Sequence, residues 1–454
     1  MFDTPFNQLA SLLRSVSGGM GDLLVRRPLY FLGRERLEIR HLFRGIERAP
    51  AVSIYTGVLW VVPLAMVNAY AAPYMVELGL SRTELGFFSA WAQGLSLLGF
   101  LTGGYLADTW GRKRTLIFFD ITSWGLYTVC LTFAFNKWWC IAAILSMATN
   151  AGANIAYQIL LVEGVKPYKR ARIFSLLQLV NLMPSLAFLP LVGGMLVMKF
   201  GLVPAGRAMY ALFFLLFMAG TYLRFRYLPD APPPDKAPSS WALAVRDVWN
   251  RSREAFASFW ERPGARPFLF ARFIEEWKFF AWNTYSTLYL LESVKVAKGD
   301  VAILAQGGAY VTFLVLVMVI PYISVRRFMS LLGYEQGFAM AAMALLYFAR
   351  GSESRLLFCF LSAGLGAVAG AFYWSANNAY WLSIMGEKER PKVISAATGV
   401  MKLGIFVLGP LAAVLYVNVS PESLVLTLMV LQAVQFVLLR RVVHEAPLAA
   451  TGRT

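Results

Sequence analysis

The range Gly104–Arg114, which reads Gly-Tyr-Leu-Ala-Asp-Thr-Trp-Gly-Arg-Lys-Arg, separates two long apolar runs and decides the fold of this chain. Its first glycine is small enough to let a neighbouring helix approach closely. Asp108 places a negative charge at the end of the preceding run, and Gly111 permits a sharp turn before Arg112 and Lys113. The stretch therefore predicts a short, charged hinge between two helices.

The composition of the chain requires a lipid environment. Its 454 residues are 58% hydrophobic and 15% charged, and a globule of ordinary composition could not hide that apolar surface. A helix needs about 20 apolar residues to cross the hydrocarbon core, and the sequence offers twelve such runs. The predicted spans lie near 51–76, 85–106, 115–135, 138–162, 173–198, 208–227, 269–291, 301–323, 334–349, 356–385, 393–417 and 423–439. We therefore expect an all-α membrane protein.

The distribution of positive charge predicts how these spans are oriented. The chain carries 42 Lys and Arg residues and a net charge of +17, which in a soluble protein would suggest a nucleic-acid partner. Most of these residues instead fall before the first span, in the even-numbered breaks and at the C-terminus. By the positive-inside rule both termini are expected in the cytoplasm, with the lipid bilayer and not nucleic acid as the partner.

A proline cluster divides the chain into two halves. The long break contains Asp-Ala-Pro-Pro-Pro-Asp-Lys-Ala-Pro, which cannot continue a helix, and a short helix is expected after it from Trp241 to Trp260. The predicted parts are a basic cytoplasmic extension (1–50), a first six-helix bundle (51–228), a cytoplasmic linker (229–266), a second six-helix bundle (267–441) and a cytoplasmic tail (442–454). The extension has no long apolar run, so it is expected to be neither a cleavable signal peptide nor a span. Its basic segment Arg34–Arg48 is expected to lie on the anionic inner leaflet, and a solvated extension is the alternative.

The two halves carry traces of a common origin. Four residues of the first half recur in the second at a constant offset of 220, and a Tyr-x-x-Glu motif recurs near the start of each half. The pairs are Arg170 with Arg390, Arg172 with Lys392, Ser175 with Ser395, Pro190 with Pro410, Tyr74 with Tyr289 and Glu77 with Glu292. Such a repeat predicts two pseudo-twofold related bundles that face each other.

The stretch Gly104–Arg114 resembles the Gly-x-x-x-Asp-x-x-Gly-Arg-basic signature of the major facilitator superfamily, which joins the second and third membrane helices. The fourth break is also similar to the family pattern, with an acid at the end of the span and then Pro167 and Arg170. The resemblance implies a cytoplasmic charge cluster that acts as a gate. Its expected members are Gly104, Asp108, Gly111, Arg112, Lys113, Glu163 and Arg170.

Polar residues deep in the predicted spans are the candidates for substrate binding, because carriers of this kind bind near the membrane midplane. The candidates are Asn68, Asn150, Asn154, Tyr157, Gln158, Gln178, Trp282, Asn283, Tyr373, Trp374, Asn377 and Asn378. Spacings of three and four place the members near 150–158 on one helical stripe, and those near 373–378 on another. For any one of them, a hydrogen bond that only holds two helices together is the alternative.

Three charged residues in the second half are candidates for coupling. If the eleventh span begins near Pro391, Lys402 lies about 16 Å along it, and if the seventh begins near Pro267, Glu275 and Glu276 lie about 12 to 14 Å along it. We expect Lys402 to pair with one of these acids, which then takes up a proton or meets the substrate. The alternative is that both acids lie at the cytoplasmic interface. Asp120 is expected to be a gate residue.

The remaining residues argue against catalysis. Only two His are present, both outside the spans, and the three Cys fall inside apolar runs without the spacing of a zinc site or a disulfide framework. We therefore expect no enzyme activity, no cofactor and no metal.

The predicted function is a secondary active transporter that moves a small organic solute by rocker-switch alternating access, with protons as a candidate coupling ion. Pro190-Leu-Val-Gly-Gly194 resembles the end of a motif of superfamily antiporters and favours efflux. Uptake or facilitated movement of a sugar or other nutrient is the alternative, and a sensor that does not transport is a further one. We expect a monomer in a bacterial inner membrane.

Overall fold

The computed structural model describes residues 46–162, 165, 173, 177, 180–181, 187–229, 246, 250, 253–254, 256–316, 332–384 and 390–445. For a few helical residues in these ranges, among them Trp374, Asn377 and Asn378, only the backbone is described. Every regular element within the described ranges is a helix, as the sequence predicts. Arg48–Thr454 forms one compact unit.

The first half of this unit contains several helices that are interrupted by short turns. A 3-10 turn at Asn68–Tyr70 separates the first two helices, a π-turn at Ile121–Gly125 interrupts the third predicted span, and a 3-10 turn at Met147–Thr149 interrupts the fourth. The helices are α4 (Arg48–Val67), α5 (Ala71–Glu77), α6 (Arg82–Thr109), α7 (Arg112–Asp120), α8 (Leu126–Thr132), α9 (Lys137–Ser146), α10 (Asn150–Val162), α12 (Leu189–Phe200) and α13 (Leu202–Tyr227).

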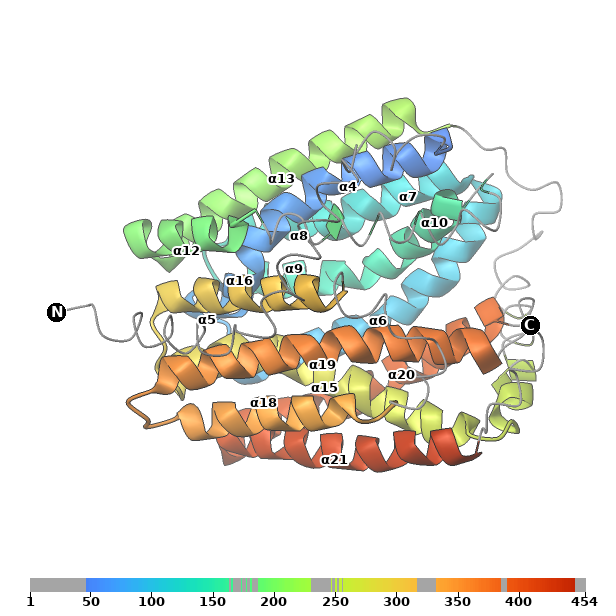
Figure 1. Ribbon diagram of the computed structural model, residues 1–454. Coiled ribbons are helices and arrows are strands. Elements are labelled where there is room, and N and C mark those ends of the chain that lie inside the picture. The colour runs from blue at the N-terminus through green and yellow to red at the C-terminus, as the bar shows by residue number, and fades with distance from the viewer. Residues whose placement is uncertain are drawn as a thin grey trace, which may run out of the picture. The chain divides into compact units, whose positions relative to one another are not determined.

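The second half contains longer uninterrupted helices. They are α15 (Ala265–Glu292), α16 (Lys298–Leu314), α18 (Glu335–Ala349), α19 (Arg355–Ile384), α20 (Arg390–Ala413) and α21 (Pro421–Glu445), and a π-turn at Val414–Val419 follows α20. In Figure 1 the helices α4, α7, α8, α10 and α13 gather in the upper part, and α15, α18, α19, α20 and α21 in the lower part.

Eight helical segments among the described residues are long and apolar enough to cross a membrane. They are Arg48–Glu77, Arg82–Thr109, Arg112–Thr132, Lys137–Gln158, Leu202–Tyr227, Arg355–Tyr373, Ala396–Val419 and Pro421–His444. Each coincides with a predicted span. The seventh, eighth and ninth predictions correspond to α15, which is long but highly charged, and to α16 and α18, which have 17 and 15 residues. Much of the fifth prediction lies outside the described residues.

Two local signals in the sequence explain where α6 ends and begins. Ser81 and Glu84 form a reciprocal cap at its start: the Glu84 N–H donates to Ser81 Oγ (3.1 Å), and the Ser81 N–H donates to Glu84 Oε2 (2.9 Å). At the other end Gly111 has φ of +93°, a conformation that other residues rarely adopt, and the chain turns there into α7. The predicted turn at Gly111 is confirmed.

The prediction that Gly104 allows a close helix contact is wrong, because the neighbouring glycine makes it. A Cβ atom built on Gly103 would lie 2.5 Å from the Gly152 Cα of α10, whereas one built on Gly104 would meet nothing within 4 Å. The sequence places two glycines side by side, and only the rotation of α6 decides which one faces α10. The small-residue contact between α6 and α10 is therefore made by Gly103.

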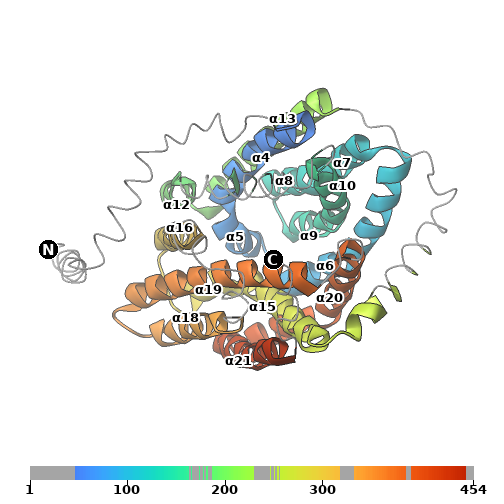
Figure 2. The ribbon, with the colours of Figure 1, turned by 45° about the vertical axis from the view of Figure 1, so that its right-hand side comes forward.

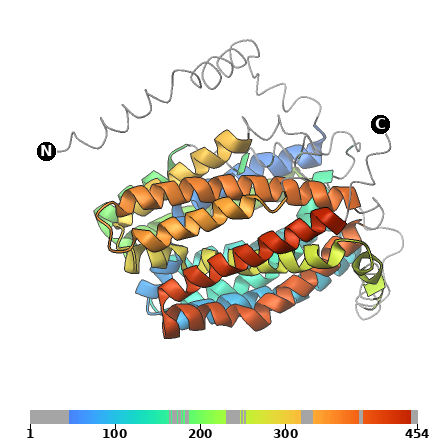
Figure 3. The ribbon, with the colours of Figure 1, turned by 60° about the horizontal axis from the view of Figure 1, so that its bottom comes forward.

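Among the described residues, two pairs of helices make most of the contacts between the two halves. Helix α6 packs against α20, and α12 packs against α16. Figure 2 shows both pairs side by side, with α4 next to α13 at the top and α18 next to α21 at the bottom. In Figure 3 α18, α19 and α21 run nearly parallel along the near face.

The repeated Tyr-x-x-Glu motif occupies matching positions in the two halves. The Tyr74 hydroxyl donates to the Leu131 carbonyl (2.6 Å), and the Tyr289 hydroxyl donates to the Leu346 carbonyl (3.4 Å). In both pairs the two residues are 57 positions apart, and each tyrosine anchors the first predicted span of its half to the third. Equal spacing and equal partners favour the internal repeat that the sequence predicts.

Candidate functional site

A cavity of about 950 Å³ is lined mainly by α15, α16, α18, α19 and α21. Four of the predicted substrate residues line it: Asn68, Trp282, Asn283 and Tyr373. Asn68 reaches it from the 3-10 turn between α4 and α5, so both halves contribute to the wall. The cavity thus combines amide groups with aromatic surface, as is typical of sites for small organic molecules.

Part of the wall of this cavity is charged. Lys278, whose side chain is buried, lies 2.9 Å from Glu275 Oε2 and donates to Gln336 Oε1 at 3.0 Å. Gln432 lines the same cavity, and its Oε1 atom is buried with no hydrogen-bond partner among the described residues. The wall therefore offers an ion pair together with an amide that is free to bind a ligand.

A second cavity, of about 350 Å³, lies where α6, α15 and α20 meet. It is lined by Glu276 and Lys402, and it shares Asn283 with the larger cavity. The Lys402 ammonium donates to Gln93 Oε1, so this hydrogen bond joins α20 of the second half to α6 of the first.

The carboxylates expected to pair with Lys402 bind bases on their own helix. Glu276 Oε1 lies 2.5 Å from an Arg272 guanidinium nitrogen, and Arg272 also donates to the Tyr373 hydroxyl at 3.2 Å. Glu275 binds Lys278, as described above. Lys402 and Glu276 share a cavity wall, but the ion pairs of the described residues do not include one between them.

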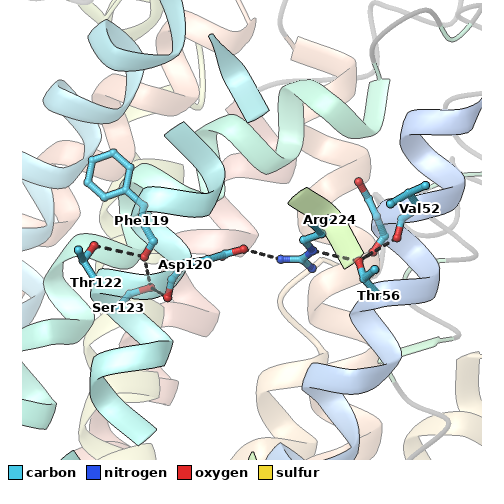
Figure 4. Close-up of polar contacts among 8 residues, drawn as sticks. Val52, Thr56, Phe119, Asp120, Thr122, Ser123 and Arg224 are labelled. Atoms are coloured by element: carbon cyan, nitrogen blue, oxygen red, sulfur yellow. Dashed lines mark hydrogen bonds and ion pairs between the residues drawn. The ribbon is translucent and has the colours of Figure 1, made fainter. Parts of the chain in front are cut away.

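A buried ion pair inside the first half involves Asp120, which the sequence suggested as a gate residue. Arg224 on α13 binds Asp120 Oδ2 at 2.7 Å and donates to Thr56 Oγ1 on α4 at 2.9 Å (Figure 4). The guanidinium lies over the Tyr157 ring, 5.3 Å from its centroid. Asp120 is 4% and Arg224 8% exposed, and neither lines the two cavities. The geometry is that of a pair that fixes α4, α7 and α13 together.

The stripe predicted on α10 does not line either cavity. Tyr157 faces Arg224 inside the first half, Asn150 is half-buried, and Asn154 and Gln158 are exposed. Gln178 and the side chains of Trp374, Asn377 and Asn378 lie outside the described residues. Substrate contact by these eight residues therefore stays a prediction.

The predicted gate is described only in part. Asp108 is half-buried near the end of α6, close enough to Arg112 at the start of α7 for the two charges to interact. The Lys113 ammonium lies over the Phe225 ring of α13, 5.5 Å from its centroid. Glu163 and Arg170 lie outside the described residues.

A set of reciprocal contacts closes the interface between the halves at the end where α5 meets α6 and α15 meets α16. Arg82 binds Glu292 at 2.8 Å, and Lys298 binds Glu77 at 3.4 Å. The Tyr285 hydroxyl donates to the Arg82 carbonyl (2.9 Å), and the Tyr70 hydroxyl donates to the Lys298 carbonyl (2.8 Å). We call these six residues the latch. Each half contributes one tyrosine, one glutamate and one base, in the same order along the chain.

Sequence reasoning did not single out several residues of these sites. Arg272, Gln336 and Gln432 were missed, although each is a polar residue inside an apolar run, which is the signal that identified the others. Arg82 and Lys298 were missed because each lies in a break, where a lone base is unremarkable. Their partners are more than 200 positions away, and the sequence gives no sign of that pairing.

The sequence profile described as Major Facilitator Superfamily matches residues 56–357, well over half of the chain. The chain belongs to the major facilitator superfamily. This superfamily member is an integral membrane protein, and the family resemblance of its Gly104–Arg114 stretch is confirmed.

Solved structures of transporters share the fold of this superfamily member at low sequence identity. The nucleoside transporter NupG is 13% identical, with a TM-score of 0.64, and the alignment covers 87% of this chain and 98% of that one. A peptide transporter POT in complex with sulfate is 14% identical, with a TM-score of 0.67, covering 89% and 95%. A bacterial homologue of the human lysosomal transporter Spinster, in an inward-facing and unoccupied conformation, is 14% identical, with a TM-score of 0.60, covering 88% and 98%. No curated protein sequence matches this chain.

Proposed function

We propose that the protein is a secondary active transporter that carries a small organic solute by alternating access. Two six-helix bundles, twelve spans in all with both termini in the cytoplasm, rock about the cavities that lie between them. The observation that carries this proposal is the latch, a reciprocal set of contacts that joins the two halves at one end of their interface.

The strength of the latch suits a contact that must break and reform in each cycle. Its ion pairs are partly exposed, at 44% and 30% for Arg82 and Glu292 and at 50% and 45% for Lys298 and Glu77. Ion pairs of this kind each contribute about 0 to 1 kcal/mol. Binding energy of the order of a few kcal/mol is enough to shift such an equilibrium.

The sidedness of the basic residues favours the external face as the location of the latch. The breaks that contain it are the first and the seventh, which are odd-numbered, whereas the basic hinge at Gly111 lies in an even-numbered break. The described conformation is then closed to the outside. The charge cluster of Asp108, Arg112 and Glu163 forms the opposing, cytoplasmic gate.

The coupling group belongs to the second half in this proposal. Glu276 and Lys402 line one cavity, and Glu275 lines the other, so all three can meet a substrate or a proton that enters.

Uptake of a sugar or another neutral nutrient is the second candidate function. It is favoured by the amide and aromatic groups of Asn68, Trp282 and Asn283 in the larger cavity. Efflux is favoured by the Pro190–Gly194 motif, whose proline lies at the start of α12 and lines that cavity.

A reversible cross-link across the latch tests the transport cycle. With Arg82→Cys and Glu292→Cys joined by a bifunctional methanethiosulfonate, which forms a disulfide with each cysteine, counterflow of a pooled set of labelled solutes into proteoliposomes should stop, and a reductant should restore it. The matched control is Glu84→Cys with Lys137→Cys, an ion pair of 2.9 Å that lies within the first half. Joining the control pair should leave exchange unchanged.

Two results would count against the proposal. If the unmodified protein exchanges no solute of the pool, which includes a sugar, a nucleoside, a dipeptide, a carboxylic acid and an amine, a sensor is the better interpretation. If the cross-linked latch exchanges solute as fast as the reduced protein, the two halves do not separate there during transport.

A further inference from the structure

Lys402 is a charged side chain in the interior whose described hydrogen-bond partner is neutral. Its ammonium lines the smaller cavity and donates one hydrogen bond, to the amide oxygen of Gln93. An ammonium group has three donors. Among the described residues no ion pair includes Lys402.

The two carboxylates that the sequence predicts at a similar membrane depth to Lys402 are already paired with other bases. Arg272 binds Glu276 and Lys278 binds Glu275, both on α15. Of the described residues, two bases line the two cavities, Lys278 and Lys402, and only Lys402 has no carboxylate within ion-pair distance.

A positive charge kept inside a membrane protein is costly unless a partner compensates it. Gln93 supplies a dipole but no charge. A ligand with a negative charge would supply such a partner, and it would find two further donors on the ammonium. Such a ligand needs to reach Lys402, and the cavity that it lines gives it access.

We propose that the substrate is an organic anion whose carboxylate binds Lys402 in the smaller cavity. This inference rests on the proposed transport function and names the substrate class of that site. Asn283 and Phe279 line both cavities, so a carboxylate held at Lys402 leaves the body of the molecule free to extend into the larger one. There Asn68 and Trp282 offer an amide and an aromatic face, which suit an uncharged body with both polar and apolar groups.

The test compares acids with neutral molecules of the same shape. Proteoliposomes that contain the full chain are assayed by counterflow with labelled lactate and benzoate, with their neutral counterparts lactamide and benzamide, with the cation benzylamine, and with glucose and thymidine. We expect the acids to exchange and their amides to fail. In Lys402→Gln the concentration for half-maximal exchange of the acids should rise at least about tenfold, because a hydrogen-bonded charge pair is lost.

Two further variants distinguish an effect of the charge on Lys402 from an effect on folding. Lys402→Arg keeps the charge and should retain exchange of the acids. Lys199→Gln removes an exposed lysine at the end of α12, outside both cavities, and should change nothing. A thermal unfolding curve for Lys402→Gln without ligand shows that the variant is folded.

The outcomes distinguish this inference from the function on which it rests. Exchange of glucose, thymidine, an amide or benzylamine without exchange of the acids would overturn the organic-anion assignment and leave the transporter intact. Acids that exchange in Lys402→Gln with unchanged affinity would overturn it as well. If none of the solutes exchanges, the transport proposal fails and the assignment fails with it.

Discussion

At the scale of single residues, Asp120 and Arg224 form the most deeply buried ion pair in the described part of the chain. Both side chains are buried among α4, α7 and α13, and Thr56 satisfies a further donor of the guanidinium. When one member of a buried pair is removed, the other is left as an uncompensated charge, and the cost is about 3 to 5 kcal/mol.

We therefore expect Arg224→Met to lower the free energy of unfolding by about 3 to 5 kcal/mol. The matched control is Arg226→Met, an exposed arginine on the same helix, which should change it by less than about 0.5 kcal/mol. Thermal unfolding of the purified protein in detergent measures both. Adding Asp120→Leu to Arg224→Met should recover most of the loss, since no isolated charge remains. If Arg224→Met and Arg226→Met lowered the free energy of unfolding equally, the buried pair would not be the cause of the destabilisation.

At the scale of helices, the contact between α6 and α10 depends on one glycine of two. Gly103→Ala would place a methyl group 2.5 Å from the Gly152 Cα, which is backbone and cannot move aside, whereas Gly104→Ala meets open space. We expect Gly103→Ala to lower the unfolding temperature by several degrees, because overpacking costs about 1 to 3 kcal/mol. Gly104→Ala should leave it equal or slightly higher, since alanine favours the helix. Thermal unfolding of the two variants measures this difference. Equal unfolding temperatures would show that Gly103 does not make the close contact with α10.

The same helix shows how far sequence reasoning reaches. The apolar run predicts the span, and the charged stretch after it predicts the turn at Gly111, because both depend on neighbours along the chain. The choice between Gly103 and Gly104 depends on the rotation of α6 about its axis, and the partner of Lys402 depends on which helix of the other half lies opposite. Both are settled by packing between segments far apart in sequence, so the pattern of one segment does not reveal them.

At the scale of the whole molecule, the latch sets the balance between conformations. Arg82→Glu would place two carboxylates opposite each other at Glu292 and shift the population toward a form that is open at this face. A cysteine at Asn68, in the larger cavity, reports the opening through its rate of reaction with an impermeant maleimide added outside. We expect the rate to rise several-fold in Arg82→Glu and to return toward that of the parent when Glu292→Arg restores the pair. An unchanged rate in the single variant would show that the latch does not control access.

The turns that interrupt the first half have a mechanical consequence. A helix without a break carries a continuous ladder of backbone hydrogen bonds and resists bending, whereas a change to 3-10 or π geometry creates a joint. Asn68–Tyr70, Ile121–Gly125 and Met147–Thr149 are three such joints. One end of each helix can then tilt while the other stays in place. Asn68 begins one of these joints and also faces the larger cavity. A molecule that occupies the cavity therefore contacts the first span directly at its joint between α4 and α5.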